Sequence, residues 1–196
     1  MRARLIEVAA DLIYEKGVDR TSLDEVLEKS GASKSQLYHY FADKDALVLA
    51  VIRSQTERVL ALQQPHLARL DSLAALQRWR DAVLVLAKAA PGLRGCPLGS
   101  LASELANRFE EARTLLAGSF DTWREQIEEG FEAMRARGEL AESADPHALA
   151  LAILAALQGG LLLAKTARTV RPLEAALDMA LEHVARHATG KSARKA

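Results

Sequence analysis

The stretch Thr21–Leu47 constrains the fold of this 196-residue chain more than any other part of the sequence. Thr21 precedes apolar residues at helical spacing and has a carboxylate three residues later, which is the spacing of a capping box at a helix start. Gly31 can adopt the left-handed conformation that ends a helix. Ser33 is suited to cap a second helix over Lys34–Tyr40. Two short helices joined by a glycine turn predict a helix-turn-helix, whose second helix enters the major groove of DNA.

The apolar composition predicts that the rest of the chain is helical as well. Apolar residues make up 49% of the sequence and are mainly Leu and Ala, which favour helices over strands. All five prolines fall between the periodic segments, where they would not interrupt a helix. We therefore expect an all-α protein of about nine helices, counted from the apolar periodicity.

The expected domains are a three-helix head over residues 1–46 and a ligand-binding and dimerisation body over residues 47–190. The first helix should cover residues 2–17, and the fourth should start at Ala42 or Asp43 and run towards Leu62. The polar, basic tail, residues 191–196, is expected to be disordered. The body helices are expected at Leu70–Ala89, Leu101–Arg108, Glu110–Arg137, His147–Thr166 and Leu173–His187.

The charge distribution predicts weak non-specific binding to DNA. The formal net charge is zero at pH 7, and basic and acidic residues nearly balance even within residues 1–55. Phosphates would be neutralised by the few cations that face the duplex, for which the candidates are Arg2, Arg4, Lys34 and Lys44. Specific contacts and dimerisation would then supply most of the affinity.

The single cysteine excludes an internal disulfide and gives no zinc-binding spacing. We therefore expect a reducing, cytoplasmic location. No charged and apolar leader is present, and the longest apolar run, Leu149–Ala164, contains Gln158 and two glycines and is expected to be too short to span a membrane.

The residue pattern predicts neither an enzyme nor a cofactor protein. The five histidines are scattered, and no Ser/His/Asp grouping or glycine-rich phosphate loop occurs. His183 and His187 have the spacing of metal ligands but lack an acidic or cysteine companion in the sequence. We expect no catalytic residues, no metal and no cofactor.

Helical periodicity sorts the residues of the second helix of the helix-turn-helix. Leu37 and Phe41 are four residues apart and should bury into the head. The remaining side chains suit DNA, because glutamine can bond adenine, lysine can reach guanine, and an aromatic edge can meet a thymine methyl group. The outward-facing set is Lys34, Ser35, Gln36, Tyr38, His39 and Tyr40.

The same stretch resembles the TetR family of bacterial transcriptional regulators. The resemblance covers about the first quarter of the chain and rests on Thr21, Val26, Gly31, Ser33, Leu37, Tyr38, Tyr40, Phe41, Lys44 and Leu47. It implies that Lys34, Ser35, Gln36 and His39 face the bases. It implies that phosphates are contacted by Thr21, Tyr38, Tyr40 and Lys44, and Ser33 completes the expected DNA-binding set. Leu27 and Gln36 depart from the usual alanine and threonine, so the operator sequence does not carry over.

Aromatic and apolar residues recur along the body helices. The resemblance implies an effector cavity in the body, and the expected ligand-binding residues are Trp79, Cys96, Phe120, Trp123 and Ile127. The alternative is that this stripe forms plain core, which is common for helices. Glu104, Arg108 and Gln158 are further polar candidates for holding the effector, whose chemical class the sequence does not indicate.

Cys96 lies in the segment Gly95–Leu101, at the expected start of the short sixth helix. A thiol at a helix start near Arg94 can have a lowered pKa and react with electrophiles or oxidants. The segment is similar to those of electrophile- or redox-responsive family members. The alternative is a small buried residue that fills a tight junction between helices.

The last two helices are apolar on more than one face, which indicates burial on several sides. The resemblance implies that they pair with those of a second copy as a four-helix bundle; a monomer with a thick core is the alternative. The expected dimer contacts are Leu154, Gln158, Leu161, Leu162, Leu177 and Val184.

These observations together predict a homodimeric regulator of transcription. We expect a repressor that binds a palindromic operator in double-stranded DNA and is released by a small-molecule or electrophile effector. The alternative is a helical ligand- or redox-sensing protein whose head contacts a protein partner. We expect no membrane association.

Overall fold

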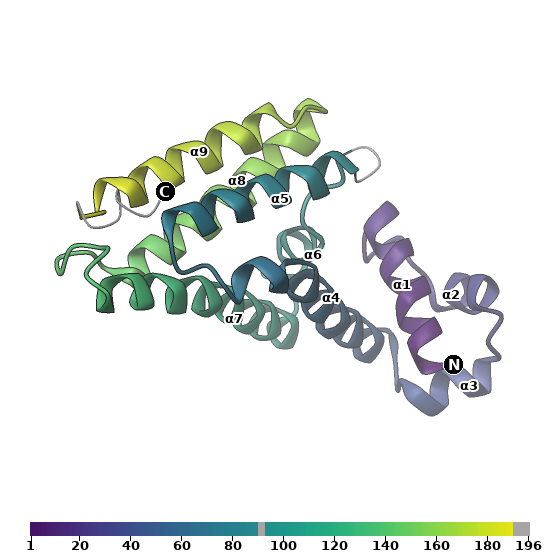
Figure 1. The fold of residues 1–196 in the computed structure, drawn as a ribbon. Helices are drawn as coiled ribbons and strands as arrows, with labels where there is room; N and C mark the ends of the chain where they lie inside the picture. Colours follow the sequence, from purple (N-terminus) through teal and green to yellow (C-terminus); the bar gives the residue numbers. More distant parts are fainter. Residues whose placement is uncertain (90–92, 190–196) are drawn as a thin grey trace. The chain divides into compact units, whose positions relative to one another are not determined.

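The computed structural model describes residues 1–89 and 93–189, which are all-α apart from one isolated bridge between Leu140 and Ala188. This confirms the expected fold class. The tail expected to be disordered and Pro91 lie outside the described residues. The described part of the chain forms nine helices (Figure 1): α1 (Arg2–Lys16), α2 (Leu23–Ser30), α3 (Lys34–Tyr40), α4 (Lys44–Leu67), α5 (Leu73–Ala89), α6 (Pro97–Leu105), α7 (Glu110–Ala136), α8 (Pro146–Ala167) and α9 (Arg171–Arg186).

The helices form two compact units. The first contains Met1–Val59 and Pro97–Ser119, and the second contains the described residues of Leu60–Cys96 and Phe120–Ala196. Both α4 and α7 therefore contribute residues to each unit. The division differs from the boundary after residue 46 that the sequence suggests, because α6 and the start of α7 pack with the helix-turn-helix in one unit.

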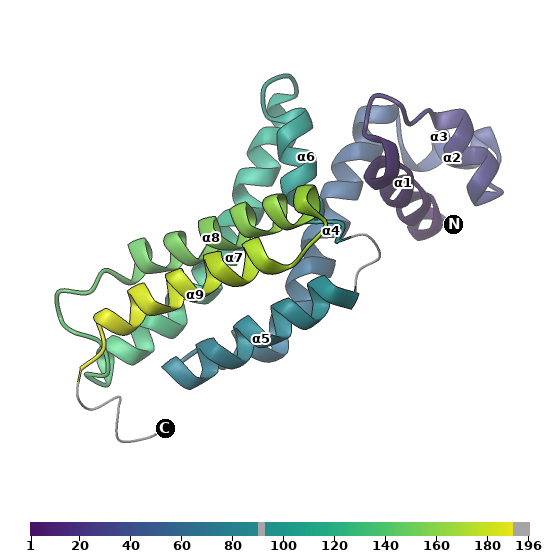
Figure 2. The ribbon, with the colours of Figure 1, turned by 90° about the horizontal axis from the view of Figure 1, so that it is seen from above.

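In the first unit, α1 completes the helix-turn-helix. The three short helices α1, α2 and α3 lie together in both views of the ribbon (Figures 1 and 2). Leu5, Val26 and Leu37, one from each helix, are fully buried. Two helices as short as α2 and α3 are not stable alone, so α1 supplies the apolar surface that holds them.

The start of α2 differs from the sequence prediction. The capping residue is Ser22, whose hydroxyl accepts the N–H of Glu25, and not Thr21. The Thr21 hydroxyl instead donates to the carbonyl oxygen of Gly17 at 2.9 Å, and Thr21 is only 3% exposed. Two adjacent hydroxyl residues make either cap possible from sequence alone, and the packing of the α1–α2 turn decides between them.

The predicted turn and the start of α3 are confirmed. Gly31 has φ of +69° and ends α2 in the left-handed conformation, which costs glycine little because it has no Cβ. Ser33 caps α3 through the N–H of Gln36. Asp43 caps α4 by accepting the N–H of Ala46 at 2.8 Å.

The prolines do not all lie between helices as the sequence suggests. Pro65 lies inside α4, which continues to Leu67. Proline removes one backbone hydrogen bond from a helix. The loss is tolerated at Pro65 because α4 ends within one turn of it. Pro146 and Pro172 lie in the first turns of α8 and α9, and Pro97 opens α6, because the fixed φ of proline suits the start of a helix.

Two body helices also differ in their limits. The sixth helix covers Pro97–Leu105 and not Leu101–Arg108, because Pro97 begins it one turn earlier. The fifth begins at Leu73 after Ser72, whose hydroxyl accepts the N–H of Ala75.

The second unit is built on close helix packing. Trp79, Trp123 and Phe131 are its largest fully buried side chains. Helices α8 and α9 lie side by side in Figures 1 and 2. They approach closely at Gly160, where an added Cβ would lie 2.8 Å from the Cα of Leu173.

Candidate nucleic-acid interface

The exposed face of α3 is the candidate DNA-reading surface. Leu37 is fully buried and Phe41 is 3% exposed, so the helix is fixed to the head along one side. This confirms the predicted division of the helix between core and surface. The side chains that remain exposed are Lys34, Ser35, Gln36, Tyr38, His39 and Tyr40.

Gln36 has a structural bond that the sequence analysis missed. Its Oε1 accepts the backbone N–H of Ser33 at 2.9 Å, and the backbone N–H of Gln36 donates to the Ser33 hydroxyl at 3.2 Å. This is a capping box, and the hydroxyl-x-x-glutamine spacing in the sequence already signals it. Bidentate recognition of adenine requires both the oxygen and the nitrogen of the amide. In this conformation the Oε1 of Gln36 already accepts one hydrogen bond, so Nε2 is the amide group that is left without competition for a base.

Aromatic contacts restrict the rest of the α3 surface. The Lys34 ammonium lies 6.0 Å from the centre of the Tyr38 ring, and the His39 and Tyr40 rings meet edge to face at 4.9 Å. Such contacts lower the conformational freedom of exposed side chains before a ligand binds. The exposed face of α3 is therefore partly preorganised.

Arg2 joins this surface from α1. Its guanidinium lies 5.5 Å from the centre of the Phe41 ring, directly after the end of α3. A cation held there by a buried aromatic ring remains available to a phosphate, since Arg2 itself is exposed. The sequence suggested Arg2 as a phosphate-binding cation but did not place it.

Thr21 and Lys44, two of the residues expected to contact phosphates, are poorly placed to do so in this structure. Thr21 is nearly buried and its hydroxyl proton is donated to Gly17, so it offers no donor to a phosphate in this conformation. Lys44 is partly exposed in the first turn of α4 and lies near the Asp19 carboxylate, which offsets part of its charge.

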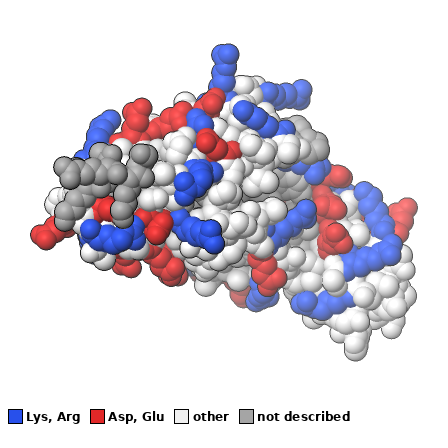
Figure 3. Space-filling model, viewed as in Figure 1, with Lys and Arg blue, Asp and Glu red and all other residues white. Residues whose placement is uncertain are grey.

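Asp19 also pairs with Arg108, which lies in the turn after α6. The Arg108 Nη1 donates to Asp19 Oδ2 at 2.7 Å, and this hydrogen bond lowers the pKa of the Asp19 carboxyl below its usual range. The carboxyl therefore stays ionised close to Lys44. Basic and acidic side chains are intermixed over the face shown in Figure 3, in line with the expectation that charge alone does not hold DNA.

The two tryptophans expected to bind an effector differ in their hydrogen bonding. The Trp79 indole N–H donates to Gln63 Oε1 at 3.0 Å, and both residues are buried. The Trp123 N–H is also buried but has no partner among the described residues. The same holds for Gln126 Oε1 and Gln158 Nε2. Buried polar atoms without partners are rare in folded proteins, so each of these three atoms could form a hydrogen bond with a polar ligand.

The other expected ligand-binding residues vary in exposure. Ile127 is fully buried and Phe120 is half-buried, whereas Cys96 is 8% exposed directly before α6. The sequence holds one cysteine, so Cys96 forms no internal disulfide. In the part of the chain that the structure describes, no group of three or more His, Cys, Asp or Glu residues could hold a metal ion.

The expected dimer contacts fall into two classes. Leu154, Leu177 and Val184 are buried within the single chain by the packing of α8 and α9, and thus have little surface to offer a partner. Gln158 and Leu161 are half-buried, and Leu162 is 62% exposed. Three further exposed apolar side chains, which the sequence analysis did not assign to the interface, are Leu151, Leu163 and Met179.

Helix α8 is longer and more apolar than the sequence analysis allowed. Its 22 residues are enough to cross a membrane by length and composition, although core helices of soluble proteins pass the same test. Only 39% of its most apolar window is buried within the chain. Exposed apolar surface of this kind is typical of an interaction site.

Comparison with known proteins identifies relatives along most of the chain. Residues 5–51 match the profile of bacterial regulatory proteins of the tetR family, and residues 67–180 match the tetracyclin repressor-like C-terminal domain. The transcriptional regulator AcuR of Cereibacter sphaeroides is 33% identical over 176 residues, which cover 86% of this chain and 78% of that protein.

Solved structures agree with this similarity. A TetR transcriptional regulator from Chloroflexus aurantiacus has a TM-score of 0.84 at 27% identity, with 95% of each chain covered. The regulatory protein TetR from Rhodobacter sphaeroides has a TM-score of 0.81 at 28% identity, with 92% of this chain and 97% of that chain covered.

Proposed function

Because the chain belongs to the TetR family of DNA-binding transcriptional regulators, we propose that it is a homodimeric repressor that leaves its operator when the second unit binds a small molecule. The observation that carries the proposal is the face of α3: an exposed set of lysine, serine, histidine and tyrosine side chains on a helix anchored by Leu37 and Phe41. A repressor is favoured because the second matched profile is described as tetracyclin repressor-like. We place the protein in the cytoplasm, where its DNA lies.

The proposed base-reading residues are Lys34, Ser35 and His39, with the Nε2 of Gln36. Lys34, Ser35 and Gln36 lie in the first turn of α3, and His39 is exposed near its end. The N-terminal residues of a recognition helix contact base edges. Tyr38, Tyr40 and Ser33 are proposed to position the helix through phosphates, together with Arg2 and Lys44. Thr21 takes no part in the proposed interface, because its hydroxyl is already used inside the head.

The proposed dimer contact is an exposed stripe on α8, extended by Met179 on α9. Leu151, Ala155, Gly159 and Leu163 are spaced four residues apart, so they share one helix face, and all four are exposed. Nothing lies within 4 Å of a Cβ added to Gly159. Small residues at the centre of the stripe would let the α8 helices of two copies approach closely, and the leucines at its ends would be buried.

The proposed effector site lies around Trp123 in the second unit. A ligand that accepts a hydrogen bond from the buried Trp123 N–H would satisfy an otherwise unpaired donor. Trp79 is assigned to the core and not to ligand binding, since Gln63 already uses its N–H. Cys96 is kept as an electrophile-sensitive candidate, and alkylation of Cys96 without any change in DNA affinity would remove it.

The proposed release mechanism is geometric. A twofold dimer reads two half-sites on one face of the duplex, so its two α3 helices must be separated by about 34 Å or a multiple of it. Helices α4 and α7 contribute to both compact units. A ligand that shifts either helix therefore changes the spacing of both reading heads together.

Binding of the full-length protein to DNA from upstream of its own gene tests this function. Lys34→Ala should weaken binding at least tenfold and should reduce the discrimination between this DNA and unrelated DNA, because a contact to the bases is lost. Lys88→Ala is the matched control, because it removes the same charge from an exposed position on α5. Equal effects of the two substitutions, or binding insensitive to salt, would instead favour a head that contacts protein.

Leu162→Asp tests the dimer separately. A charge on this exposed position of α8 should shift the protein from dimer to monomer in sedimentation experiments at micromolar concentration. Leu62→Asp is the control, since Leu62 is similarly exposed on α4. A dimer that withstands Leu162→Asp places the interface elsewhere.

A further inference from the structure

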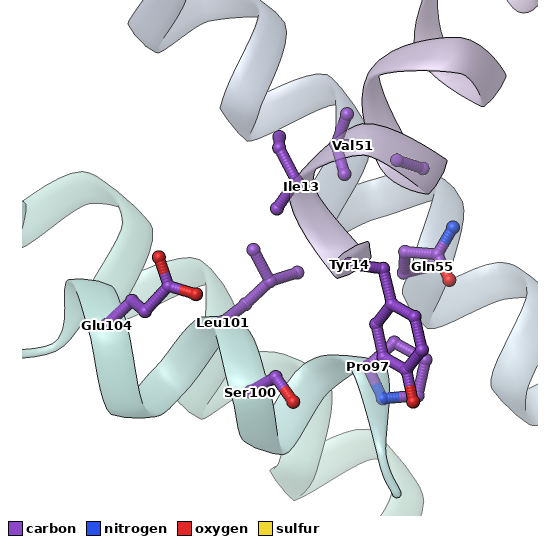
Figure 4. A pocket seen from close by; sticks show the side chains of 9 residues that line it. Ile13, Tyr14, Val51, Gln55, Pro97, Ser100, Leu101 and Glu104 are labelled. Carbon is purple, nitrogen blue, oxygen red and sulfur yellow. The ribbon is translucent and has the colours of Figure 1, made fainter. Parts of the chain in front are cut away.

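A pocket lies between α1, α4 and α6 and is built entirely from the first compact unit (Figure 4). About 290 Å³ of space outside the protein atoms lies at the pocket, and part of that space is open solvent. Ile13, Val51 and Leu101, one from each helix, form its apolar wall. Because part of this space is open solvent, the enclosed volume lies well below the range of about 300–1,000 Å³ that accommodates drug-sized ligands. The pocket therefore suits a molecule of a few heavy atoms.

The polar side of the pocket is rich in hydrogen-bond acceptors. Gln55 contributes an amide, Tyr14 and Ser100 contribute hydroxyl groups, and Glu104 contributes a carboxylate. Among the described residues that line the pocket, Glu104 is the only one with a full charge. An apolar wall facing one carboxylate and three neutral polar groups complements a short aliphatic cation.

Glu104 also holds the head. Its Oε2 accepts the backbone N–H of Val18 at 2.7 Å, directly after Gly17 ends α1. A Cβ added to Gly17 would lie 3.0 Å from the same carboxylate, so the approach is close. One side chain of α6 therefore lines the pocket and fixes the turn that leads from α1 into the helix-turn-helix.

We propose that this pocket binds a small primary alkylammonium ion, with its ammonium group on Glu104 and its alkyl chain against Ile13, Val51 and Leu101. The ammonium competes with the Val18 N–H for the carboxylate. Occupancy then loosens the α1–α2 turn and weakens DNA binding. This site lies in the first unit, and it does not depend on the effector site proposed around Trp123.

Calorimetric titration of the full-length protein with n-butylammonium tests the proposal. At constant ionic strength, butylammonium should bind saturably and at least tenfold more tightly than n-butanol or butyrate, because only the ammonium makes charge-assisted hydrogen bonds to the carboxylate. Ammonium chloride at the same concentration controls for the bulk cation. Absence of saturable binding, or equal binding of butanol, would overturn the proposal.

Three variants locate the binding. Glu104→Gln keeps an oxygen for the Val18 N–H but removes the charge, and should weaken binding at least tenfold. Glu111→Gln is the matched control on α7, where the carboxylate is exposed, and should bind as the wild type does. Ser100→Leu fills the pocket from a helical position, and should abolish binding even if Glu104→Gln fails to fold. Unchanged binding in Ser100→Leu excludes this pocket.

DNA binding tests the regulatory consequence. Saturating butylammonium should lower the affinity of the wild type for DNA from upstream of its gene several-fold, and should leave the affinity of Ser100→Leu unchanged. If butylammonium binds but affects the DNA affinity of both proteins equally, the link through Glu104 is wrong. The Trp123 site is tested independently, because neither variant alters the second unit.

Discussion

Gly130 and Gly118, both within α7, should respond oppositely to the same substitution by alanine. Gly130 is buried, and a Cβ added to it would lie against the carbonyl oxygen of Leu70 and 2.9 Å from the carbonyl carbon. Gly118 is exposed, and nothing lies within 4 Å of its added Cβ. Alanine has the same helix-propensity advantage over glycine at both positions. The difference in free energy of unfolding between the two variants therefore measures the cost of the close approach to Leu70.

The magnitudes follow from helix propensity and packing. Alanine is favoured over glycine in a helix interior by about 1 kcal/mol, so Gly118→Ala should raise the free energy of unfolding by about that amount. At Gly130 the same gain is opposed by displacement of a backbone carbonyl group, which cannot rotate away as a side chain can. Overpacking of this kind costs about 1–3 kcal/mol or more, so Gly130→Ala should be destabilising overall.

Thermal unfolding followed by circular dichroism measures both effects. For a chain of this size, about 1 kcal/mol corresponds to about 2–4 °C in Tm, so Gly118→Ala should raise Tm by that amount. Gly130→Ala should lower it. Protein concentration must be the same in all samples, because the stability of a dimer depends on concentration. A Gly130→Ala protein as stable as Gly118→Ala would refute the close packing of α7 against Leu70.

Three further predictions concern hydrogen bonds and ion pairs. Gln36→Glu should keep the capping box and the stability of the head but should lower DNA affinity, because the added charge repels phosphates. Gln36→Leu should lower the free energy of unfolding by about 0.5–1 kcal/mol in urea titrations, because the cap is lost. Equal stability of the two variants would exclude a capping role. Asp178→Ala should lower the free energy of unfolding by about 1 kcal/mol in the same assay. Asp178 Oδ1 accepts from Arg80 Nε at 2.8 Å, and Oδ2 accepts from Nη2 at 2.9 Å. An unchanged free energy of unfolding would mean that the cost of desolvating the pair cancels its attraction. Because the Arg108 hydrogen bond lowers the pKa of the Asp19 carboxyl in the folded state below its unfolded value, the ionised pair stabilises the fold at pH values above the unfolded pKa. This contribution is lost as the pH falls through the folded pKa. The stability difference between the wild type and Asp19→Asn should therefore shrink on acidification, and a difference that grows would contradict the pairing.

Local signals in the sequence were sufficient for the reading head. Gly31 and Ser33 act on their immediate neighbours, through a left-handed backbone conformation and a side-chain cap, so their roles can be predicted without knowledge of the fold. The burial of Leu37 follows from helical spacing in the same way. The family resemblance of this stretch is confirmed by the matched profiles.

The choice between equivalent side chains required the tertiary structure. Thr21 and Ser22 are both capable caps, and the carbonyl oxygen of Gly17 decides between them because it takes the Thr21 hydroxyl. Trp79 and Trp123 have the same apolar character in sequence. They differ because Gln63, distant along the chain from Trp123, reaches only the Trp79 N–H.

Burial within the chain was likewise decided by packing between helices. Apolar residues on all sides of a helix indicate that it is covered, but not by what. Leu154 and Leu177 are buried within the single chain, whereas Leu162 on α8 is left exposed. The sequence by itself determined the helices, their order and the reading head, because these depend on local spacing and capping. The tertiary structure decided which side chains remain free to bind, because that depends on which distant residue occupies each surface and each hydrogen-bonding group first.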